Sequence, residues 1–364
     1  MLCKLLNYAR KLKQMKPHKK KGQNRNNYKM NLITCPLCKF DKYIIVHKHN
    51  KDIYWKNTTV QNVICKRCGL VYLNPQPNEK SMRKFYIQDC RNVINQPYPT
   101  KEYLQTIKLR TDTQINWLGP LIGLNNKTNS KNKNKNILDI GSAAGVFLNY
   151  FKEAGYNCHG VEPTTTFAKF SQKEFGHKIS NSTLQEAKFI QKFDIITISH
   201  VLEHVYNLSG FLKEVNKLLK KDGLLFIEVP NVHRRKFVNK TFFHVQHLYN
   251  FSKITLSMLL FMSGFKVLNT WDHKNLRILA KKTSIKTTKP FSSTFFTENG
   301  ENWKDIYKDI KSPIKQIKIY IKNPLNKIFS PIMHFFRLTL EKIVGKKITK
   351  SLRNFWRRKV CTSP

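Results

Sequence analysis

One stretch constrains the fold of this chain more than any other, because it reads as an apolar strand, a turn of small residues and a helix in direct succession. The stretch runs from Asn136 to Phe151 and has the letters NILDIGSAAGVFLNYF. Chains bind nucleotides at such junctions. A phosphate-binding P-loop would end in Gly-Lys-Ser/Thr, but the turn Gly141–Gly145 contains no lysine. A dinucleotide fingerprint would also carry a glycine at a middle position. The nucleotide must therefore be inferred from residues further along the chain.

From Ile137 onward, apolar strand-like runs alternate with helical runs, which is the pattern of a parallel α/β sheet. We therefore predict an α/β fold with a Rossmann-like sheet. The expected helix at 208–223 is amphipathic and ends at Gly223. The expected strands are 136–141, 157–163, 193–201, 224–231, 266–272 and 275–282, and the expected helices are 146–155, 165–176, 208–223 and 252–265.

Two Cys-x-x-Cys pairs precede this region. Cys35 and Cys38 form the first pair and Cys65 and Cys68 form the second, with twenty-six residues between the pairs. Thiolates suit tetrahedral zinc, and each pair offers two of them from one tight turn. Gly69 follows the second pair, where such a turn needs a residue that tolerates positive φ. Because four cysteines leave no ligand position open, the spacing predicts a structural Zn²⁺ site.

A carboxylate marks the end of the second expected strand. Glu162 stands there, twenty-one residues after Gly141, where a carboxylate can accept hydrogen bonds from both hydroxyls of a ribose. The turn without its middle glycine does not suit close approach to a pyrophosphate. A ligand with a ribose and no phosphate, S-adenosylmethionine (SAM), fits better. Asp139, just before the turn, would then face the ammonium group of its methionine part.

The ordered motifs of this region resemble those of class I SAM-dependent methyltransferases. These motifs are LDIGSAAGVFL, GVEP, FDIITISHVLEHV, LLKKDGLLFIEVPN and HLYNFSKITLSMLLFMSGF. The upstream run CKRCGLVYLNPQPNEKSMRKFY is similar to the exit of the zinc module in one subgroup of that family. The subgroup includes sugar C-methyltransferases and methyltransferases of surface-glycan gene clusters. The resemblance covers about residues 33–283.

The resemblance also implies which residues hold SAM. Asp139 and the small residues of the turn would line the methionine end, and Glu162 would bind the ribose. Thr183 lies where such folds hold the adenine, and Ser199 and His200 follow the fourth strand at the sheet edge nearest the sulfonium. The implied cofactor-binding set is Asp139, Gly141, Ser142, Ala143, Gly145, Glu162, Thr183 and Ser199.

Three histidines are candidates for the base that removes a proton from the methyl acceptor, because imidazole titrates near neutral pH. His247 matches the position of a general base in the sugar C-methyltransferases that the chain resembles. Those enzymes carry a glutamate before that histidine, whereas Gln246 stands here. His200 could face the acceptor, and His204 is interpreted as an anchor of the strand–helix junction. We predict His247 as the base and His200 as the second candidate, with a packing histidine as the alternative for His247.

Composition and pattern divide the chain into four parts. These are a basic leader at 1–31, a zinc-binding module with its linker at 32–90, a methyltransferase domain at 91–283 and a basic helical tail at 284–364. In the tail, two stretches carry bulky apolar residues on one helical face with lysine and arginine beside them, at 330–345 and 348–360. Basic amphipathic helices of this kind are typical of membrane surfaces. A cap on the catalytic domain and a dimer contact are the alternatives.

The net charge of +44, from 66 Lys+Arg against 22 Asp+Glu, favours polyanionic partners or anionic membranes. Eight cysteines in this pairing indicate a reducing compartment, and the basic start of the chain does not read as a signal peptide. We therefore expect a cytoplasmic protein, peripheral at the membrane if the tail binds there.

The function predicted from these features is a SAM-dependent methyltransferase whose acceptor is a small molecule, a sugar, or a glycan or lipid-linked molecule. The alternatives are an RNA or DNA methyltransferase and a non-catalytic zinc-containing binding protein. Against nucleic acid, Ser199-His200-Val201-Leu202 stands where base-amine methyltransferases carry an Asn/Asp-Pro-Pro-aromatic turn.

Overall fold

The computed structural model describes residues 29–52, 55, 58–85, 97–124, 132–233, 242–283 and 303–311. The expected leader therefore lies outside the described residues except for its last three. Both amphipathic stretches predicted for the tail, 330–345 and 348–360, also lie outside them. Among the helices that the structure describes, none combines the length and the apolar character needed to cross a membrane.

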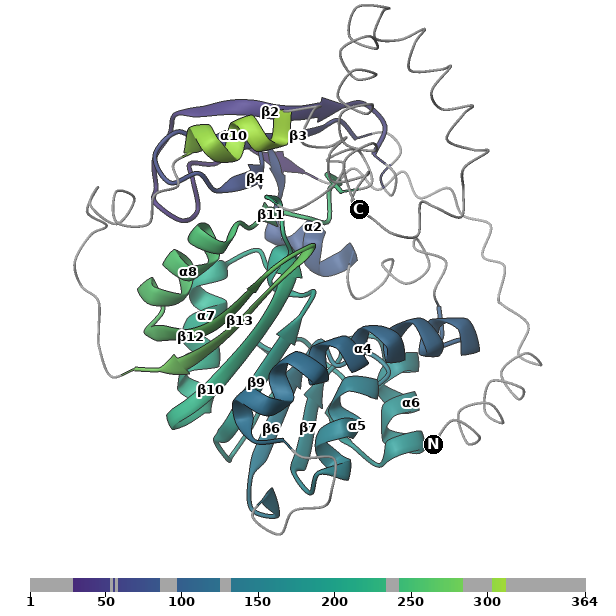
Figure 1. The fold of residues 1–364 in the computed structure, drawn as a ribbon. Helices are drawn as coiled ribbons and strands as arrows, with labels where there is room; N and C mark the ends of the chain where they lie inside the picture. The colour runs from purple at the N-terminus through teal and green to yellow at the C-terminus, as the bar shows by residue number, and fades with distance from the viewer. Residues whose placement is uncertain are drawn as a thin grey trace, which may run out of the picture. The chain divides into compact units, whose positions relative to one another are not determined.

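A seven-stranded sheet forms the centre of the fold (Figure 1). Its strand order is β12-β13-β10-β9-β6-β7-β8. The pairs between β6, β7, β8, β9 and β10 are parallel, whereas β13 pairs antiparallel with both β10 and β12. The strands are β6 (Asn136–Ile140), β7 (Asn157–Val161), β8 (Lys178–Ser180), β9 (Phe193–Ser199), β10 (Leu219–Pro230), β12 (Phe265–Asp272) and β13 (Asn275–Lys282).

Helices cover both faces of this sheet, as Figure 1 shows. Alternate residues of one strand point to opposite faces, so Ile137 packs toward α4 and α5 while Leu138 packs toward α7 and α8. Strands buried on both faces are apolar along their whole length, which is why the strand signal in this region of the sequence is strong. The helices are α4 (Lys101–Ile122), α5 (Val146–Glu153), α6 (Thr165–Phe175), α7 (Leu208–Leu218) and α8 (Lys253–Met262).

The third expected helix ends five residues earlier than predicted. Helix α7 stops at Leu218, and β10 begins at the next residue. Leu219 is fully buried and pairs with Phe193 of β9, and the register of that pairing then shifts before Leu224. Asp222 has a φ of 63°, so the chain turns here outside a helical conformation. The amphipathic pattern continues through Lys220 and Lys221, but pairing with the sheet ends the helix before them.

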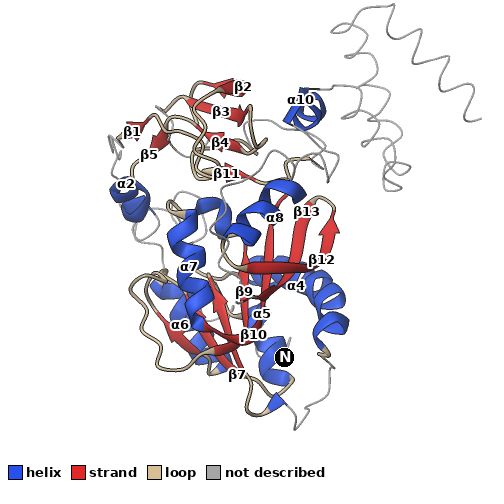
Figure 2. Cartoon of the chain, turned by 90° about the vertical axis from the view of Figure 1, so that its left-hand side faces the viewer, coloured by secondary structure: helices blue, strands red, loops and turns tan. Residues whose placement is uncertain are grey.

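A smaller four-stranded sheet, ordered β11-β4-β3-β2, lies at one end of the large sheet (Figure 2). Its strands are β2 (Tyr43–His49), β3 (Val60–Cys65), β4 (Val71–Leu73) and β11 (Tyr249–Asn250). Strand β11 lies more than 170 residues after β4 in the chain, yet Tyr249 pairs with Tyr72 across the sheet. The two sheets also share one continuous apolar core. The cysteine-containing part and the large-sheet part are thus packed into one unit.

Four short elements complete this end of the molecule. Strands β1 (Met30–Asn31) and β5 (Gln76–Pro77) pair antiparallel. Helix α2 (Glu79–Lys84) follows, with Asn78 as its N-cap accepting from the amide of Ser81. Helix α10 (Trp303–Lys311) lies inside the expected tail but packs against β2 and β3, where Ile306 is buried. That contact is long-range in sequence and has no local signal.

Candidate active site

A cavity of about 460 Å³ opens at the carboxyl ends of β6, β7 and β9. Strand β6 is the point at which the strand order reverses, and open α/β sheets bind their ligands beside such a point. The cavity is lined by Ile140, Gly141, Val161, Glu162, Pro163, Thr164, Thr183, Leu184, Gln185, Glu186, His200, Val201, His204, Val205, Tyr206, Asn207, Phe211 and Gln246, and by Glu79, Met82 and Arg83 of α2.

The turn after β6 requires its two glycines for steric reasons. Gly141 and Gly145 both have a φ of 76°, a conformation that residues with a Cβ adopt only under strain. A Cβ on Gly141 would lie 2.3 Å from a methyl carbon of Val201, and one on Gly145 would lie 2.1 Å from the hydroxyl oxygen of Ser171. The turn is therefore closed tightly between β9 and α6, and Gly141 itself forms part of the cavity wall.

Glu162 lines the cavity and its carboxylate is held by two backbone amides. Ala143 donates to one carboxylate oxygen at 3.0 Å and Thr164 donates to the other at 2.8 Å. A carboxylate oxygen can accept more than one hydrogen bond, so these contacts are compatible with a further donor such as a ribose hydroxyl. The geometry ties the carboxylate directly to the glycine turn, because Ala143 belongs to that turn.

Asp139 is buried behind the turn and is not among the residues that line the cavity. The Thr197 hydroxyl donates to its carboxylate at 2.6 Å. Burial raises the pKa of Asp139 to about 7, although the Thr197 hydrogen bond and the Arg110 charge oppose that shift. Its predicted contact with a methionine ammonium stays a prediction.

The remaining predicted cofactor residues fall into two groups. Thr183 lines the cavity, and its amide and hydroxyl both donate to Glu186. Ser142, Ala143, Gly145 and Ser199 do not line it. Ser199 instead accepts from Gln114 of α4 at 2.8 Å. The part that each of these residues plays in binding SAM also stays a prediction.

His200 lies on the cavity wall between two buried carboxylates. Its Nδ1 is 3.3 Å from Glu203 and its Nε2 is 3.1 Å from Glu228. Burial disfavours the charged ring, but the hydrogen bond to Glu228 and the close contact with Glu203 outweigh burial and raise the pKa of His200. The pKa of Glu228 falls to about 2 despite its burial, because His200 and Arg277 both stabilise the carboxylate. His200 is therefore more readily protonated than an ordinary histidine.

His204 and His247 lie side by side, with ring centroids 5.1 Å apart. Nδ1 of His204 is 2.8 Å from the carbonyl of Gln246, and Nδ1 of His247 is 3.0 Å from the carbonyl of Phe242. His204 lines the cavity and His247 does not. Burial and neighbouring histidines hold the pKa of His247 well below its usual value, so its ring is neutral at neutral pH.

The contribution of α2 to the cavity could not be found from the sequence. Arg83 forms an ion pair with Glu186 on the loop after β8, and Met82 is buried against the same space. The two partners of the ion pair are 103 residues apart. The resemblance gives no binding role to either residue. Only the three-dimensional structure therefore brings Arg83 and Glu186 together at the cavity.

The sheet order, the glycine turn and the position of Glu162 define a Rossmann-like domain. Residues 121–270 match a family model described as a methyltransferase domain. This confirms the predicted fold class and the predicted resemblance to SAM-dependent methyltransferases.

Comparison with known proteins finds similar chains that are named as methyltransferases. The chain is 31% identical over 113 residues to a ubiquinone biosynthesis O-methyltransferase of Pelagibacter ubique, covering 29% of this chain and 46% of the relative. It is 29% identical over 154 residues to the enzyme of that name from Actinobacillus pleuropneumoniae, covering 39% of this chain and 66% of the relative. The chain thus spans about half to two thirds of the length of these curated relatives.

Among solved structures, the chain is similar to a 1,6-didemethyltoxoflavin-N1-methyltransferase of Burkholderia thailandensis. That likeness has a TM-score of 0.46 and 18% identity, and it covers 65% of this chain and all of the other. A magnesium protoporphyrin IX methyltransferase of Synechocystis gives a TM-score of 0.41 and 12% identity over 56% of this chain and 99% of the other.

The steric role of Gly141 can be tested by substitution. We expect Gly141→Ala to lower the free energy of unfolding by about 2–4 kcal/mol, because the new Cβ adds a clash with Val201 to the strain of positive φ. Gly123→Ala is the matched control, since Gly123 has a φ of 67° and nothing within 4 Å of a new Cβ; it should cost only about 1–2 kcal/mol. Urea unfolding of the three proteins measures both values, and equal costs would contradict the steric argument.

Proposed function

We propose that the protein is a SAM-dependent methyltransferase that acts on a small molecule. The observation that carries this proposal is the cavity that joins the glycine turn and Glu162 to the histidine-bearing segment after β9. SAM would supply an electrophilic methyl group. Glu162 would hold the ribose, and the segment 183–186 would lie beside the adenine. The acceptor would then enter from the side of His204, Tyr206 and Gln246.

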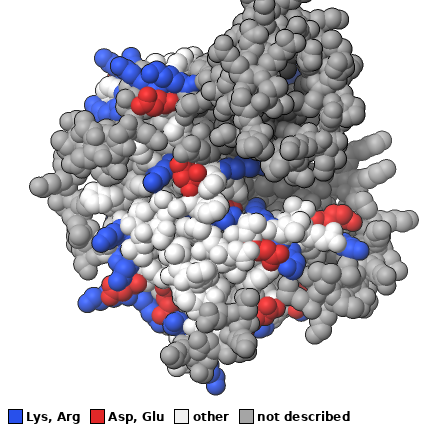
Figure 3. Space-filling model, in the orientation of Figure 1, with Lys and Arg blue, Asp and Glu red and all other residues white. Residues whose placement is uncertain are grey.

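The finer proposal concerns the acceptor, for which we favour a hydroxyl-bearing molecule. The resemblance to sugar C-methyltransferases suggests a sugar or a lipid-linked sugar, and the O-methyltransferase names of the relatives suggest oxygen as the methylated atom. The polar groups of His200, His204, Asn207 and Gln246 on one wall of the cavity suit hydroxyl groups. On the face shown in Figure 3, described lysines and arginines are scattered among acidic residues, which gives no support to a nucleic-acid acceptor there.

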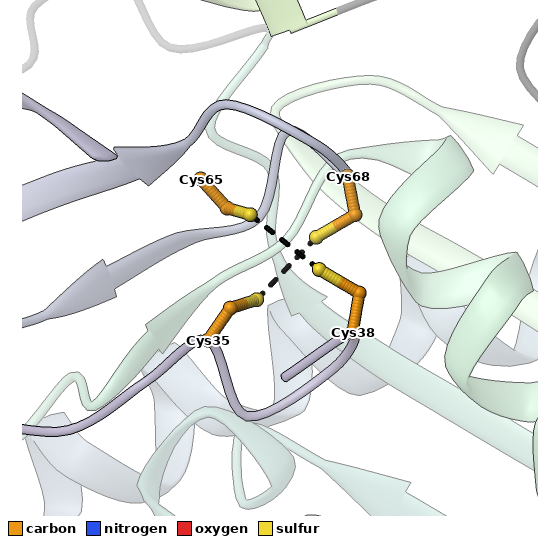
Figure 4. Close-up of side chains that lie close together, drawn as sticks. All are labelled: Cys35, Cys38, Cys65 and Cys68. Carbon is orange, nitrogen blue, oxygen red and sulfur yellow. Dashed lines mark hydrogen bonds between the residues drawn. The ribbon is translucent and has the colours of Figure 1, made fainter. Parts of the chain in front are cut away.

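We also propose that the four-cysteine cluster holds structural zinc. The sulfurs of all four cysteines point toward one centre (Figure 4). Sγ of Cys35 lies 3.4 Å from that of Cys68, and Sγ of Cys38 lies 3.5 Å from that of Cys65. Tetrahedral zinc with bonds of about 2.3 Å places its sulfur ligands about 3.8 Å apart, so the donor set fits zinc in both chemistry and spacing.

The ribose role of Glu162 is tested by binding. We expect Glu162→Ala to weaken both SAM and its demethylated product by about 1–3 kcal/mol, because a buried ribose would lose its acceptor. Isothermal titration calorimetry measures both affinities. Glu153→Ala, which removes an exposed carboxylate from α5, is the control and should bind like the wild type. Equal affinities for all three proteins would reject the ribose assignment.

Zinc at the cysteine cluster is tested by elemental analysis. We expect Cys35→Ser to release this zinc and to lower the melting temperature, because the metal joins two turns of the small sheet. Cys158→Ser is the control, since Cys158 is a buried cysteine of β7 outside the cluster, and it should leave the zinc content unchanged. A wild-type protein without zinc would contradict this proposal.

The base role of His247 is tested by turnover and its pH dependence. We expect His247→Ala to cut turnover about 10²–10⁴-fold and to leave SAM affinity nearly unchanged, because the base acts on the acceptor. Only the neutral ring accepts a proton, so activity should fall as pH decreases through the pKa of His247, well below 6.5. Near-normal turnover of the variant would reject this role and leave His200 as the next candidate.

A further inference from the structure

A second set of side chains of the types that bind metals lies beside the cavity, apart from the four cysteines. Glu203 and His204 are neighbours in the 3-10 helix Leu202–His204, and His247 comes from the segment before β11. One ligand atom of each lies within 4.8 Å of the others, and His204 Nε2 is 3.8 Å from Glu203 Oε1. Ligands of a tetrahedral ion with bonds of about 2.1 Å lie about 3.4 Å apart. Reductions of up to about 1.4 Å in these separations would therefore bring all three onto one ion.

The hydrogen bonds of both histidines fix the tautomer that a metal needs. A backbone carbonyl only accepts hydrogen bonds, so Nδ1 of His204 must carry a proton toward Gln246, and Nδ1 of His247 must carry one toward Phe242. In a neutral ring this leaves a lone pair on each Nε2. Metal-binding histidines usually donate their other N–H in this way, which also fixes the orientation of the ring.

The burial of the Glu203 carboxylate points to a bound cation. Its side chain is only 2% exposed, and neither carboxylate oxygen has a hydrogen bond of good geometry. The nearest cationic group is His200, whose Nδ1 lies 3.3 Å away. A buried carboxylate is costly unless it is paired with charge or coordinates a metal, and the contact with His200 is made to Oε1 of Glu203. A cation between Glu203 and the two Nε2 atoms would supply that partner.

We propose that Glu203, His204 and His247 bind one divalent transition-metal ion at the wall of the cavity. Two imidazoles and one carboxylate are a donor set that proteins use for zinc and for iron(II). Three protein ligands leave at least one coordination position open.

His204 lines the cavity, so the open position can face the space proposed for the acceptor. The ion could then hold an acceptor hydroxyl and lower the pKa of that hydroxyl. This consequence rests on the proposed methyltransferase function, whereas metal binding itself does not. The assignment also competes with the base role of His247, because one Nε2 cannot bind the ion and accept a proton at the same time.

The test uses the full chain and Co²⁺ as the probe. Soft thiolates favour zinc, so the cysteine cluster keeps zinc while Co²⁺ enters the imidazole–carboxylate site. After equilibration with cobalt chloride and removal of free metal, elemental analysis should find one cobalt per wild-type chain. Glu203→Gln and His247→Ala should weaken cobalt binding more than about 100-fold, since loss of a partner outside the ligand set already costs 10–100-fold. Both variants should retain the zinc of the wild type.

His273→Ala is the matched control, because His273 is exposed and lies outside the cluster. It should bind cobalt like the wild type. If His247→Ala does not fold, as judged by thermal melting, Glu203→Gln decides the question because it keeps the size of the side chain. The proposal is overturned if wild-type protein takes up no cobalt, or if Glu203→Gln binds it as well as the wild type does. Calorimetry with SAM in the same variants reports separately on the methyltransferase assignment.

Discussion

Burial of both faces of the parallel sheet is the constraint on which the rest of this structure depends. The central strands pair their backbone groups with one another and direct side chains into two apolar layers, one against α4 and α5 and one against α7 and α8. Polar chemistry is therefore largely confined to the ends of the strands. Glu162 follows β7, and Ser199 and His200 stand at and just beyond the end of β9. The cavity forms where these ends meet.

The charged groups at that edge also stabilise one another. Glu228 of β10 is fully buried and contacts His200, Gln114 of α4 and Arg277 of β13. An isolated charge at such depth would be strongly unfavourable, whereas a carboxylate with several donors is tolerated. The network ties α4 and the antiparallel strand β13 to the rim of the cavity. The network also raises the pKa of His200. A His200 ring that already carries a proton cannot accept another, whereas the neutral ring of His247 can.

The features that sequence could predict are those with a local signal. The strands and helices around Gly141 and Glu162, and the pairing of four cysteines, follow from periodicity and spacing. The end of α7 could not be predicted in this way, because Leu219 joins the sheet by pairing with Phe193. No local pattern contains that contact. The same holds for the ion pair of Arg83 with Glu186 and for the pairing of β11 with β4. The roles predicted for individual SAM-binding residues and for His247 stay predictions, since they concern a ligand.

These long-range contacts connect the cysteine cluster to the cavity. From Cys68 the chain enters β4, which pairs with β11, and then passes through β5 into α2, where Met82 and Arg83 reach the cavity. On the other side, the amide of Val245 donates to the buried Asp52 of the small sheet's loop at 3.0 Å. The segment that carries Gln246 and His247 is thereby held from the cysteine-containing part. A metal that stabilises the small sheet would therefore also position two walls of the cavity, although its ligands lie outside the cavity lining.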